Sequence, residues 1–414
     1  MGGRGVTLSR IRYGRQLVDE ADVDAVAECL RDSMLTQGPR VARFEEALSA
    51  RLGARHAVCV SSATAGLHVL ARAFDVGPGD VVVTTPISFL ATANAFVLAG
   101  ARVAFADVDP ETALLDPDAV DEVCARLAAA GKAPKIVAAV DFAGQPFDRP
   151  RMAAVARRWG ARLVEDCAHS LGATYDVSGD TFAVGSCAHA DAAVFSFHPV
   201  KHITTGEGGA ILCNDPELLR RGRELRQHGV TRDASRFERA GDDPMVGPWY
   251  YEQQDLSTNY RLSDLQCALG LSQLAKLDAF VARRRALAAR YDQALSAAPL
   301  AGRFRRLGVL PERSHAYHIY PILLCPRDGE TVADLARRRR TVFEGLAERG
   351  IDAQVHYFPI PWQPFHRRQP RVHDGPLPGA LAYYASSLSL PLYPGLGDAE
   401  AERVIAALVE ASED

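Results

Sequence analysis

Short apolar runs alternate with longer amphipathic stretches over the first half of the chain. Continuous runs of Val, Ile, Ala and Phe are typical of strands that are buried on both faces of a parallel sheet. The stretches between them have helical length, and strand–helix alternation predicts an α/β layer architecture. The expected strands are His56–Val60, Val81–Thr84, Arg102–Asp107, Ile136–Asp141, Leu163–Asp166, Ala192–Phe197 and Ala210–Cys213, and the expected helices include Ala63–Phe74, Ala91–Ala99, Pro117–Ala130 and Arg151–Trp159.

The second half begins with a long helical pattern. Apolar residues from Leu262 to about Leu295 recur at three- and four-residue spacing, which predicts one long helix. We therefore expect a large domain over residues 1–275 and a smaller C-terminal α/β domain over residues 276–414. The further expected elements are a strand in HIYPILLC, a helix around Ala333–Arg349, a strand at Asp352–His356 and a Pro-rich loop from Pro359 to Pro378.

Composition and charge narrow the class of protein. The 414 residues are 48% hydrophobic and 24% charged, which is typical of a globular core. A net charge of −4 argues against a surface built throughout for nucleic acid. The basic clusters Arg283–Arg285 and Arg337–Arg340 lie in helical stretches, where we expect solvated helix faces, with a nucleic-acid footprint as the alternative.

Cysteine usage and the apolar runs bear on the compartment. The eight cysteines are scattered without a C-x-x-C pair, a pattern typical of reduced thiols in a cytosolic protein. The first residues contain no apolar segment of the signal-peptide kind, and no apolar run approaches the roughly 18 residues of a membrane span. We therefore expect a cytoplasmic protein with no membrane partner.

Lysine is scarce in this chain. Only four of the 47 basic residues are lysines, namely Lys132, Lys135, Lys201 and Lys276, and the rest are arginines. Arginine keeps its proton under almost all conditions, whereas a buried lysine can lose its proton and act as a nucleophile. Any lysine-dependent covalent chemistry therefore has four candidate residues.

Small polar residues follow the first expected strands. The run SSATAG at Ser61–Gly66 leads into a helix, where backbone N–H groups can hold a phosphate. An ordinary helix cap by Ser61 or Ser62 is the alternative. After the next strand comes Phe89, which is placed to stack on a planar ring or simply to pack in the core.

Two later strands are followed by titratable groups. DCAH supplies Asp166, which can keep a pyridine nitrogen protonated, and His169, which can orient the same ring; a helix cap and a satisfied histidine are the alternatives. SFHPVKHITTGEGGA supplies Ser196 and Lys201, and that lysine is either an exposed side chain or the partner of a carbonyl in a Schiff base.

All of these groups follow expected strands, so we expect them at the carboxyl edge of the sheet, where open α/β sheets bind their ligands. A phosphate cradle, a ring-stacking aromatic, a carboxylate and a lysine together suit pyridoxal phosphate. The pair His198 and His202 lacks the glutamate of H-E-x-x-H, so we expect no metal. The fingerprints of dinucleotide-binding and P-loop proteins are absent from the sequence.

The strings EDCAHSLGA, FSFHPVKHITTGEGGA and STNYRLSDLQCALGLSQL closely resemble those of the DegT-type nucleotide-sugar aminotransferases, over nearly the full chain. The resemblance implies the aspartate-aminotransferase (type I) fold, a large domain with a mainly parallel sheet, and a homodimer that uses pyridoxal 5'-phosphate. TTPISFLATAN, VDFAGQ, GPWYYEQQDL and QVHYFPI look most like the branch that aminates UDP-linked 4-keto sugars for pseudaminic acid, with glutamate as donor.

The resemblance also implies roles for single residues. Lys201 would bind the cofactor covalently, Asp166 would pair with the pyridine nitrogen, and His169 and Phe89 would contact the ring. The phosphate would be held by Ala63, Thr64 and Ser196, and Asn259 and Arg261 would reach over from the second subunit. The residues implied for the sugar nucleotide are Tyr13, Ser33, Met34, Leu35, Thr36, Asn259, Arg261, Gln354, His356 and Tyr357. The alternative for Tyr13 and Tyr357 is that they are simply packed or surface residues.

We therefore expect a transaminase in which Lys201, once released from the cofactor, moves the proton. Related dehydratases carry histidine in place of this lysine, so Lys201 favours transamination. The expected acceptor is UDP-2-acetamido-2,6-dideoxy-β-L-arabino-hex-4-ulose. The alternatives are a dTDP-4-keto-6-deoxyhexose of antibiotic biosynthesis or a pyridoxal-phosphate-binding sensor without turnover. The polar segment Asp233–Pro248 has no assigned role and could cover the substrate.

Overall fold

The central sheet is mainly parallel, as the sequence predicts. The structure, a computed structural model, describes residues 10–413 apart from 33, 240–242, 371 and 373–374. Within these residues the sheet has seven strands in the order β1-β9-β8-β5-β4-β2-β3, and β9 alone runs antiparallel to its neighbours. The strands are β1 (His56–Val60), β2 (Val81–Thr84), β3 (Arg102–Phe105), β4 (Ile136–Val140), β5 (Arg162–Asp166), β8 (Ala192–Ser196) and β9 (Gly209–Cys213).

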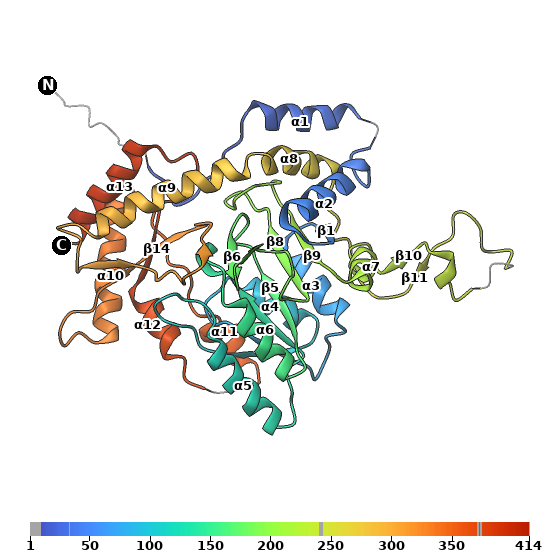
Figure 1. The fold of residues 1–414 in the computed structure, drawn as a ribbon, viewed down its shortest axis with the longest axis horizontal. Coiled ribbons are helices and arrows are strands. Elements are labelled where there is room, and N and C mark those ends of the chain that lie inside the picture. The colour runs from blue at the N-terminus through green and yellow to red at the C-terminus, as the bar shows by residue number, and fades with distance from the viewer. Residues whose placement is uncertain (1–9, 33, 240–242, 371, 373–374, 414) are drawn as a thin grey trace.

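Helices cover both faces of this sheet (Figure 1). Alternate strand residues bury into different cores: Val82 packs with the helices of one face, whereas Val81 and Val83 pack with those of the other. Both faces are apolar for this reason, and most of the strands, such as β2 and β4, are continuous hydrophobic runs. The helices are α3 (Ala63–Ala73), α4 (Ala91–Leu98) and α7 (Pro216–Leu225) on the first face, and α2 (Pro39–Leu52), α5 (Pro117–Ala129), α6 (Arg149–Arg158) and α8 (Asp264–Leu274) on the second, with α1 (Glu20–Arg31) packed outside α8.

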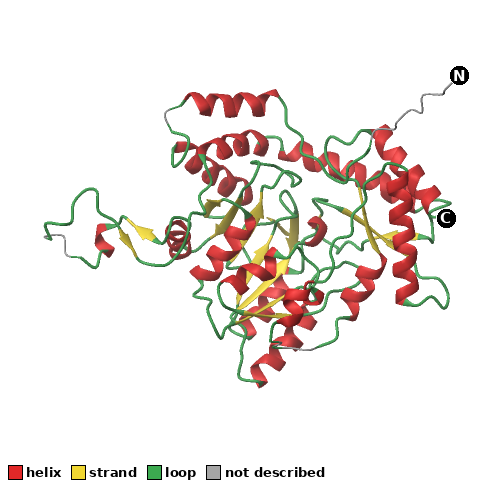
Figure 2. Cartoon of the chain, turned by 180° about the vertical axis from the view of Figure 1, so that it is seen from behind, coloured by secondary structure: helices red, strands yellow, loops and turns green. Residues whose placement is uncertain are grey.

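A second, smaller layer is built from the C-terminal part of the chain (Figure 2). Its antiparallel sheet has the order β12-β14-β15 and a core of its own, which includes Leu287, Ile322 and Leu388. The strands are β12 (Phe304–Arg306), β14 (Tyr320–Leu324) and β15 (Ser387–Leu390), and the helices around them are α9 (Leu277–Leu295), α10 (Val332–Glu348), α12 (Pro378–Ser386) and α13 (Asp398–Ala411).

The remaining strands form two small sheets. One joins β6 (Thr174–Val177), β7 (Asp180–Ala183) and β13 (Arg313–Ser314). The other pairs β10 (Val230–Thr231) with β11 (Glu252–Gln253) at the base of an arm, whose described residues are 230–239 and 243–256, that projects from the body of the molecule (Figure 1). None of the helices in the described part of the chain is both long and apolar enough to cross a membrane.

The long helix expected from Leu262 to Leu295 is in fact two helices. α8 ends at Leu274 and α9 begins at Leu277. The change of core comes later than this break: Leu277 and Val281 of α9 still pack with Cys267 of α8 in the core of the large sheet, and α9 packs with the small sheet from Leu287 onward. A periodic apolar pattern continues across the break, so the sequence does not reveal it.

Two further expectations for the C-terminal part were wrong. The segment 352–356 is not a strand, because it pairs only at single positions, such as Gln354 with Ser389. Beyond that bridge the chain turns toward the large sheet. The Pro-rich stretch contains two short elements, the 3-10 helix η3 (Ile360–Trp362) and α11 (Pro364–Arg368), because proline is well tolerated in the first turn of a helix.

The expectation of solvated arginine clusters was also wrong in part. Arg284 of the first cluster is 1% exposed and Arg339 of the second is 9% exposed. Both donate hydrogen bonds to backbone carbonyls, Arg284 to that of His318 and Arg339 to that of Tyr384. Arg284 and Arg339 are therefore buried, although the sequence pattern predicts that both clusters lie on solvated helix faces.

Candidate active site

A cavity of about 460 Å³ lies at the carboxyl ends of β1, β2, β4, β5 and β8. Its volume is within the range of about 300–1,000 Å³ that is common for small-molecule sites. The polar and aromatic residues that line it are Tyr13, Ser62, Thr64, Ser88, Phe89, Thr92, Asp166, His169, Ser196, His198, Lys201, Glu207, His318, His356 and Tyr357. The lysine, the carboxylate and the small residues thus line a single cavity, as the sequence predicts.

Lys201 lies in the loop between β8 and β9. Its backbone N–H donates to the carbonyl of His198 at 2.9 Å, and its Nζ lies 3.3 Å from Nε2 of His318. Burial lowers the pKa of Lys201 to about 8; Asp166 opposes this shift and Arg284 adds to it. A substantial fraction of the amine is therefore neutral near neutral pH, as a nucleophile or base requires.

Asp166 is the last residue of β5 and is 5% exposed. Its carboxylate accepts hydrogen bonds from Thr92 Oγ1 at 2.7 Å and from the backbone N–H of Ala168 at 3.1 Å. Burial raises its pKa, and these two hydrogen bonds together with Lys201 act against that rise. A cation placed in the cavity beside Asp166 would favour the charged carboxylate further.

Three rings meet beside these groups. The centroids of the His169 and His318 rings are 4.3 Å apart, and Nε2 of His169 lies 3.4 Å from the hydroxyl of Tyr357. Burial lowers the pKa of both histidines well below the usual value, so both are neutral. The Nδ1 atoms of both rings are buried without a hydrogen-bond partner in the described structure, which leaves them available to a bound molecule.

The start of α3 forms another wall of the cavity. Ser62 caps the helix, since its Oγ accepts the N–H of Ala65 at 3.1 Å. The N–H groups of Ala63 and Thr64 precede any helical carbonyl that could accept them, so they suit an anion. A Cβ atom on Gly209 would lie 2.6 Å from the nitrogen of Ala63, so glycine is required where β9 passes under this turn. The same segment can therefore contain a helix cap at Ser62 and still offer backbone N–H groups to a phosphate.

Phe89 lines the cavity with 60% of its surface exposed. Its ring centroid lies 6.3 Å from that of Tyr357. It is therefore not a core residue, and a ring bound in the cavity could cover it. Ser196 lines the same cavity at the end of β8.

Several predicted sugar-nucleotide residues do not line this cavity. Met34, Leu35 and Thr36 are exposed, as are Gln354 and Asn259. Arg261 lies instead in a separate groove with Arg223 and Arg226. Tyr13, His356 and Tyr357 do line the cavity, whereas Ser33 is outside the described residues.

Sequence reasoning missed two residues that contact the predicted ones. Thr92 binds Asp166 but reads as an ordinary residue at the start of a helix. His318 contacts Lys201 from 117 positions away, and the sequence places it only beside an expected strand. Neither contact has a signal in local spacing. The segment 233–248 was considered as a cover over the substrate, but none of its described residues lines this cavity.

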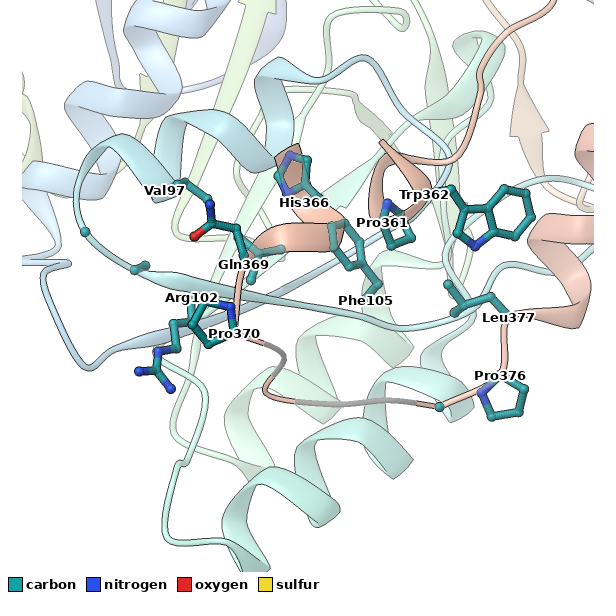
Figure 3. Close-up of a pocket in the computed structure, with 14 residues that line it drawn as sticks. Val97, Arg102, Phe105, Pro361, Trp362, His366, Gln369, Pro370, Pro376 and Leu377 are labelled. Atoms are coloured by element: carbon teal, nitrogen blue, oxygen red, sulfur yellow. The ribbon is translucent and has the colours of Figure 1, made fainter. Parts of the chain in front are cut away.

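No metal-binding group of three or more His, Cys, Asp or Glu side chains occurs among the described residues. His198 is exposed, whereas His202 is 2% exposed and contacts the carbonyl of Ala316 at 3.0 Å. A second cavity, of about 490 Å³, lies between β3 and the segment that carries η3 and α11 (Figure 3). Among its described lining residues are Phe105, Trp362 and His366 but no lysine and no carboxylate, so it lacks the groups gathered in the first cavity.

Comparison with known proteins gives a consistent picture. The sequence profile described as the DegT/DnrJ/EryC1/StrS aminotransferase family matches residues 16–409. The spore coat polysaccharide biosynthesis protein SpsC of Bacillus subtilis is 35% identical over 398 residues, which are 96% of this chain and 95% of that protein. The UDP-4-amino-4,6-dideoxy-N-acetyl-beta-L-altrosamine transaminase of Campylobacter jejuni is 34% identical over 383 residues, 92% of each chain.

A solved structure has the same fold. The Helicobacter pylori protein PseC, described as an aminotransferase involved in the biosynthesis of pseudoaminic acid, superposes with a TM-score of 0.85 at 30% identity. The match covers 98% of this chain and 100% of that one. The predicted type I aminotransferase fold is confirmed by this similarity.

Proposed function

The chain belongs to the DegT/DnrJ/EryC1/StrS aminotransferase family and is a sugar aminotransferase, and we propose that it aminates C4 of a UDP-linked 4-keto-6-deoxy-N-acetylhexosamine. The proposed acceptor is UDP-2-acetamido-2,6-dideoxy-β-L-arabino-hex-4-ulose, and the proposed donor is glutamate. The observation that carries the reaction class is the meeting of Lys201 and Asp166 in one cavity. The similarity to the Campylobacter jejuni transaminase supports the sugar.

Aminotransferases of this family use pyridoxal phosphate in general, and the residues present fit that cofactor. We propose that the start of α3, with Ala63 and Thr64, binds its phosphate together with Ser196. Asp166 would pair with the ring nitrogen, and His169 and Phe89 would contact the ring. The fit rests on the polar atoms of the cavity: the buried Nδ1 atom of His169 has no partner among the described residues, and the carboxylate of Asp166 lines the same wall.

When bound, pyridoxal phosphate supplies an aldehyde that carries the amino group and a ring that accepts electrons from the substrate carbon. Lys201 would hold the cofactor at rest and, once released, would move the proton. Its Nζ would take a proton from one of the two carbons bonded to the transferred nitrogen and deliver it to the other. The lowered pKa of Lys201, about 8, leaves the amine partly neutral for this task. Arginine keeps its proton and could not replace it.

We further propose that the enzyme is a homodimer with shared active sites. The arm of residues 230–256 exposes Met245, Trp249 and Leu256, which are 70%, 70% and 77% exposed. Large apolar side chains on a projecting segment are typical of a surface that is covered by a partner. Asn259 follows this arm, is exposed and does not line the cavity of its own chain, which suits a role in the site of the second subunit.

The sugar nucleotide would then lie between the subunits. Tyr13, His356 and Tyr357 of one chain line the cavity mouth. The turn at Met34–Thr36, together with Gln354 and Arg261, would contact the nucleotide part once the dimer has formed. None of these residues lines the cavity of its own chain, so the dimer is what would bring them to a cavity.

We place the domain boundary between residues 275 and 276 and the reaction in the cytoplasm. The boundary falls in the break between α8 and α9, and α9 packs in the core of the small sheet from Leu287 onward. The cytoplasmic proposal is supported by the eight cysteines, all of which are free thiols in the structure.

Assays with a panel of UDP- and dTDP-linked 4-keto sugars test the substrate. We expect the UDP-linked N-acetylated sugar to give the highest kcat/KM, with an amino group at C4 by NMR of the product. A higher kcat/KM for a dTDP-4-keto-6-deoxyhexose would reject the proposed sugar and keep the transaminase. Failure to form 2-oxoglutarate from glutamate with any keto sugar would revive the sensor without turnover.

A further inference from the structure

Arg284 is a buried cation with no carboxylate beside it. It lies on α9, is 1% exposed, and makes no ion pair within the part of the chain that the structure describes. Its hydrogen bonds among the described residues all go to backbone carbonyl oxygens. Burial lowers the pKa of Arg284 to about 9, which still leaves it charged at neutral pH. A guanidinium held in this way is costly, because carbonyl dipoles replace only part of its hydration.

The carbonyls that Arg284 contacts belong to segments around the Lys201 amine. Nη1 donates to His318 O at 3.0 Å, to Leu392 O at 3.0 Å and to Tyr317 O at 3.2 Å. Nη2 lies 3.5 Å from the carbonyl of Val200, the residue before Lys201. One side chain thus joins the backbone that carries Lys201 to the backbone that carries His318. These are the two residues whose side chains meet at 3.3 Å.

We propose that Arg284 is a positioning residue for Lys201: it holds the Lys201 and His318 segments together and keeps an unpaired positive charge in their shared surroundings. The inference rests on the proposed role of Lys201 as the cofactor lysine. Its chemical consequence is a larger fraction of neutral amine at a given pH, since each unit of pKa changes that fraction about tenfold.

No other charged group described around the amine lowers the pKa of Lys201 by repulsion, in addition to the larger effect of burial. Asp166, from the end of β5, is the nearby anion and raises the pKa of Lys201. His169, His202, His318 and His356 also face the site, and burial lowers the pKa of each, so they carry no charge near neutral pH. Arg284 is the remaining charged group in the described surroundings that acts on Lys201.

The test is a titration of Lys201 in the full-length, cofactor-free chain. Reductive methylation with ¹³C-formaldehyde gives few NMR signals because the chain has only four lysines, and Lys201→Ala identifies the signal of Lys201. Arg284→Gln keeps hydrogen-bond donors but removes the charge. We expect it to raise the pKa of Lys201 by up to about one unit, because a like charge disfavours the protonated amine. Arg284→Lys keeps the charge, so the pKa should stay low.

Arg339→Met is the matched control. Arg339 is also buried and also bonds backbone carbonyls, those of Tyr384 and Ser387, but it lies on α10 and has no contact with the Lys201 loop. Its loss should leave the Lys201 titration unchanged even if the chain becomes less stable. Arg284→Met replaces Arg284→Gln if the latter is not recovered folded.

An unchanged Lys201 titration in Arg284→Gln, or an equal shift in Arg339→Met, would overturn the proposal. A second readout uses the loaded enzyme: the pH at which added pyridoxal phosphate binds to Lys201, followed by visible absorbance, should rise by the same amount in Arg284→Gln. Neither readout needs a sugar substrate. If the pKa of Lys201 shifts in Arg284→Gln but the natural chain aminates no keto sugar, the proposed function is rejected and this inference stands. If the natural chain aminates a keto sugar but the pKa does not shift, this inference is rejected and the proposed function stands.

Discussion

Two buried arginines of this protein have opposite surroundings. Arg149 on α6 is 0% exposed and lies between two carboxylates, with Nη2 2.6 Å from Asp141 and Nε 2.8 Å from Glu165. Arg284 on α9 is almost equally buried but contacts only carbonyls. We call Arg149, Asp141 and Glu165 the ionic cluster, and Lys201, His318 and Arg284 the amine site.

The charges differ in how they are compensated. Burial alone would lower the pKa of Arg149, but Asp141 and Glu165 raise it well above its usual value, so the cluster is firmly charged. Ser170 adds a hydrogen bond to Asp141 at 2.7 Å. In the amine site, by contrast, burial lowers the pKa of Lys201 to about 8 with Asp166 as the opposing charge. The ion pairs of Arg149 with Asp141 and Glu165 hold the ends of β4 and β5 together. The amine of Lys201 has less compensation, so it can lose its proton more easily.

The largest expected effect is in the amine site. Lys201→Ala should reduce amino transfer to the assay background, because it removes the residue that we propose holds the cofactor and moves the proton. The folded chain should survive, since the change removes a buried amine and leaves no carboxylate that depended on it alone. Turnover and urea unfolding measure the two properties. Lys135→Ala, a lysine at the surface ion pair with Asp80, is the control and should keep full activity.

The ionic cluster should respond in the opposite way. Arg149→Met leaves Asp141 and Glu165 buried without their cation, which costs about 3–5 kcal/mol of unfolding free energy. Urea denaturation followed by circular dichroism measures this loss. Arg284→Gln leaves no buried carboxylate unpaired, so its loss should be smaller. An equal loss in both variants would break the distinction between the two regions.

A matched pair of hydroxyls sharpens the comparison. Thr92 donates to Asp166 and Ser170 donates to Asp141, both at 2.7 Å. A hydrogen bond to a charged group is worth about 1.5–3 kcal/mol. Thr92→Val should therefore lower kcat/KM by about ten- to a hundredfold, because Asp166 is less readily charged.

Ser170→Ala should instead lower the unfolding free energy, by about 1.5–3 kcal/mol, with kcat/KM changed less than in Thr92→Val. Steady-state kinetics and urea unfolding on both variants give the four values needed. The comparison fails if the two substitutions affect the same quantity to the same extent.

The pH dependence of stability tests the amine site without any substrate. In the cofactor-free chain the folded pKa of Lys201 is about 8, below its ordinary value of 10.5. Between these values the unfolded state binds more protons, so the Lys201 contribution to stability rises with pH. Lys201→Met should lack this rise between pH 8 and 10.5. Urea midpoints measured across that window for both chains provide the check, and identical slopes would contradict the lowered pKa.

Several parts of the fold were predictable because they depend on local patterns. The strands of the central sheet are continuous apolar runs, and each was found within one or two residues. The break at Ala275–Lys276 was missed because the apolar spacing is continuous across it. The segment 352–356 has a strand-like composition, but only one of its residues finds a partner on β15.

The predicted site has a similar division. Lys201, Asp166, His169 and Ser196 come together because the carboxyl ends of parallel strands share one edge of the sheet, a rule that needs no coordinates. Their catalytic roles remain proposals. Met34 to Thr36, Gln354 and Asn259 are exposed and do not line the cavity of their own chain, so their predicted contacts with the sugar nucleotide depend on the proposed dimer.

The sequence by itself determined the kind of sheet, the edge at which ligands bind and the short list of four lysines. These properties follow from residue type and order along the chain. Tertiary structure alone decided that His318 contacts Lys201 and that Arg284 is buried beside it rather than solvated on a helix face. Burial and electrostatic shifts depend on which distant segments exclude water from a group, and local sequence does not specify those segments.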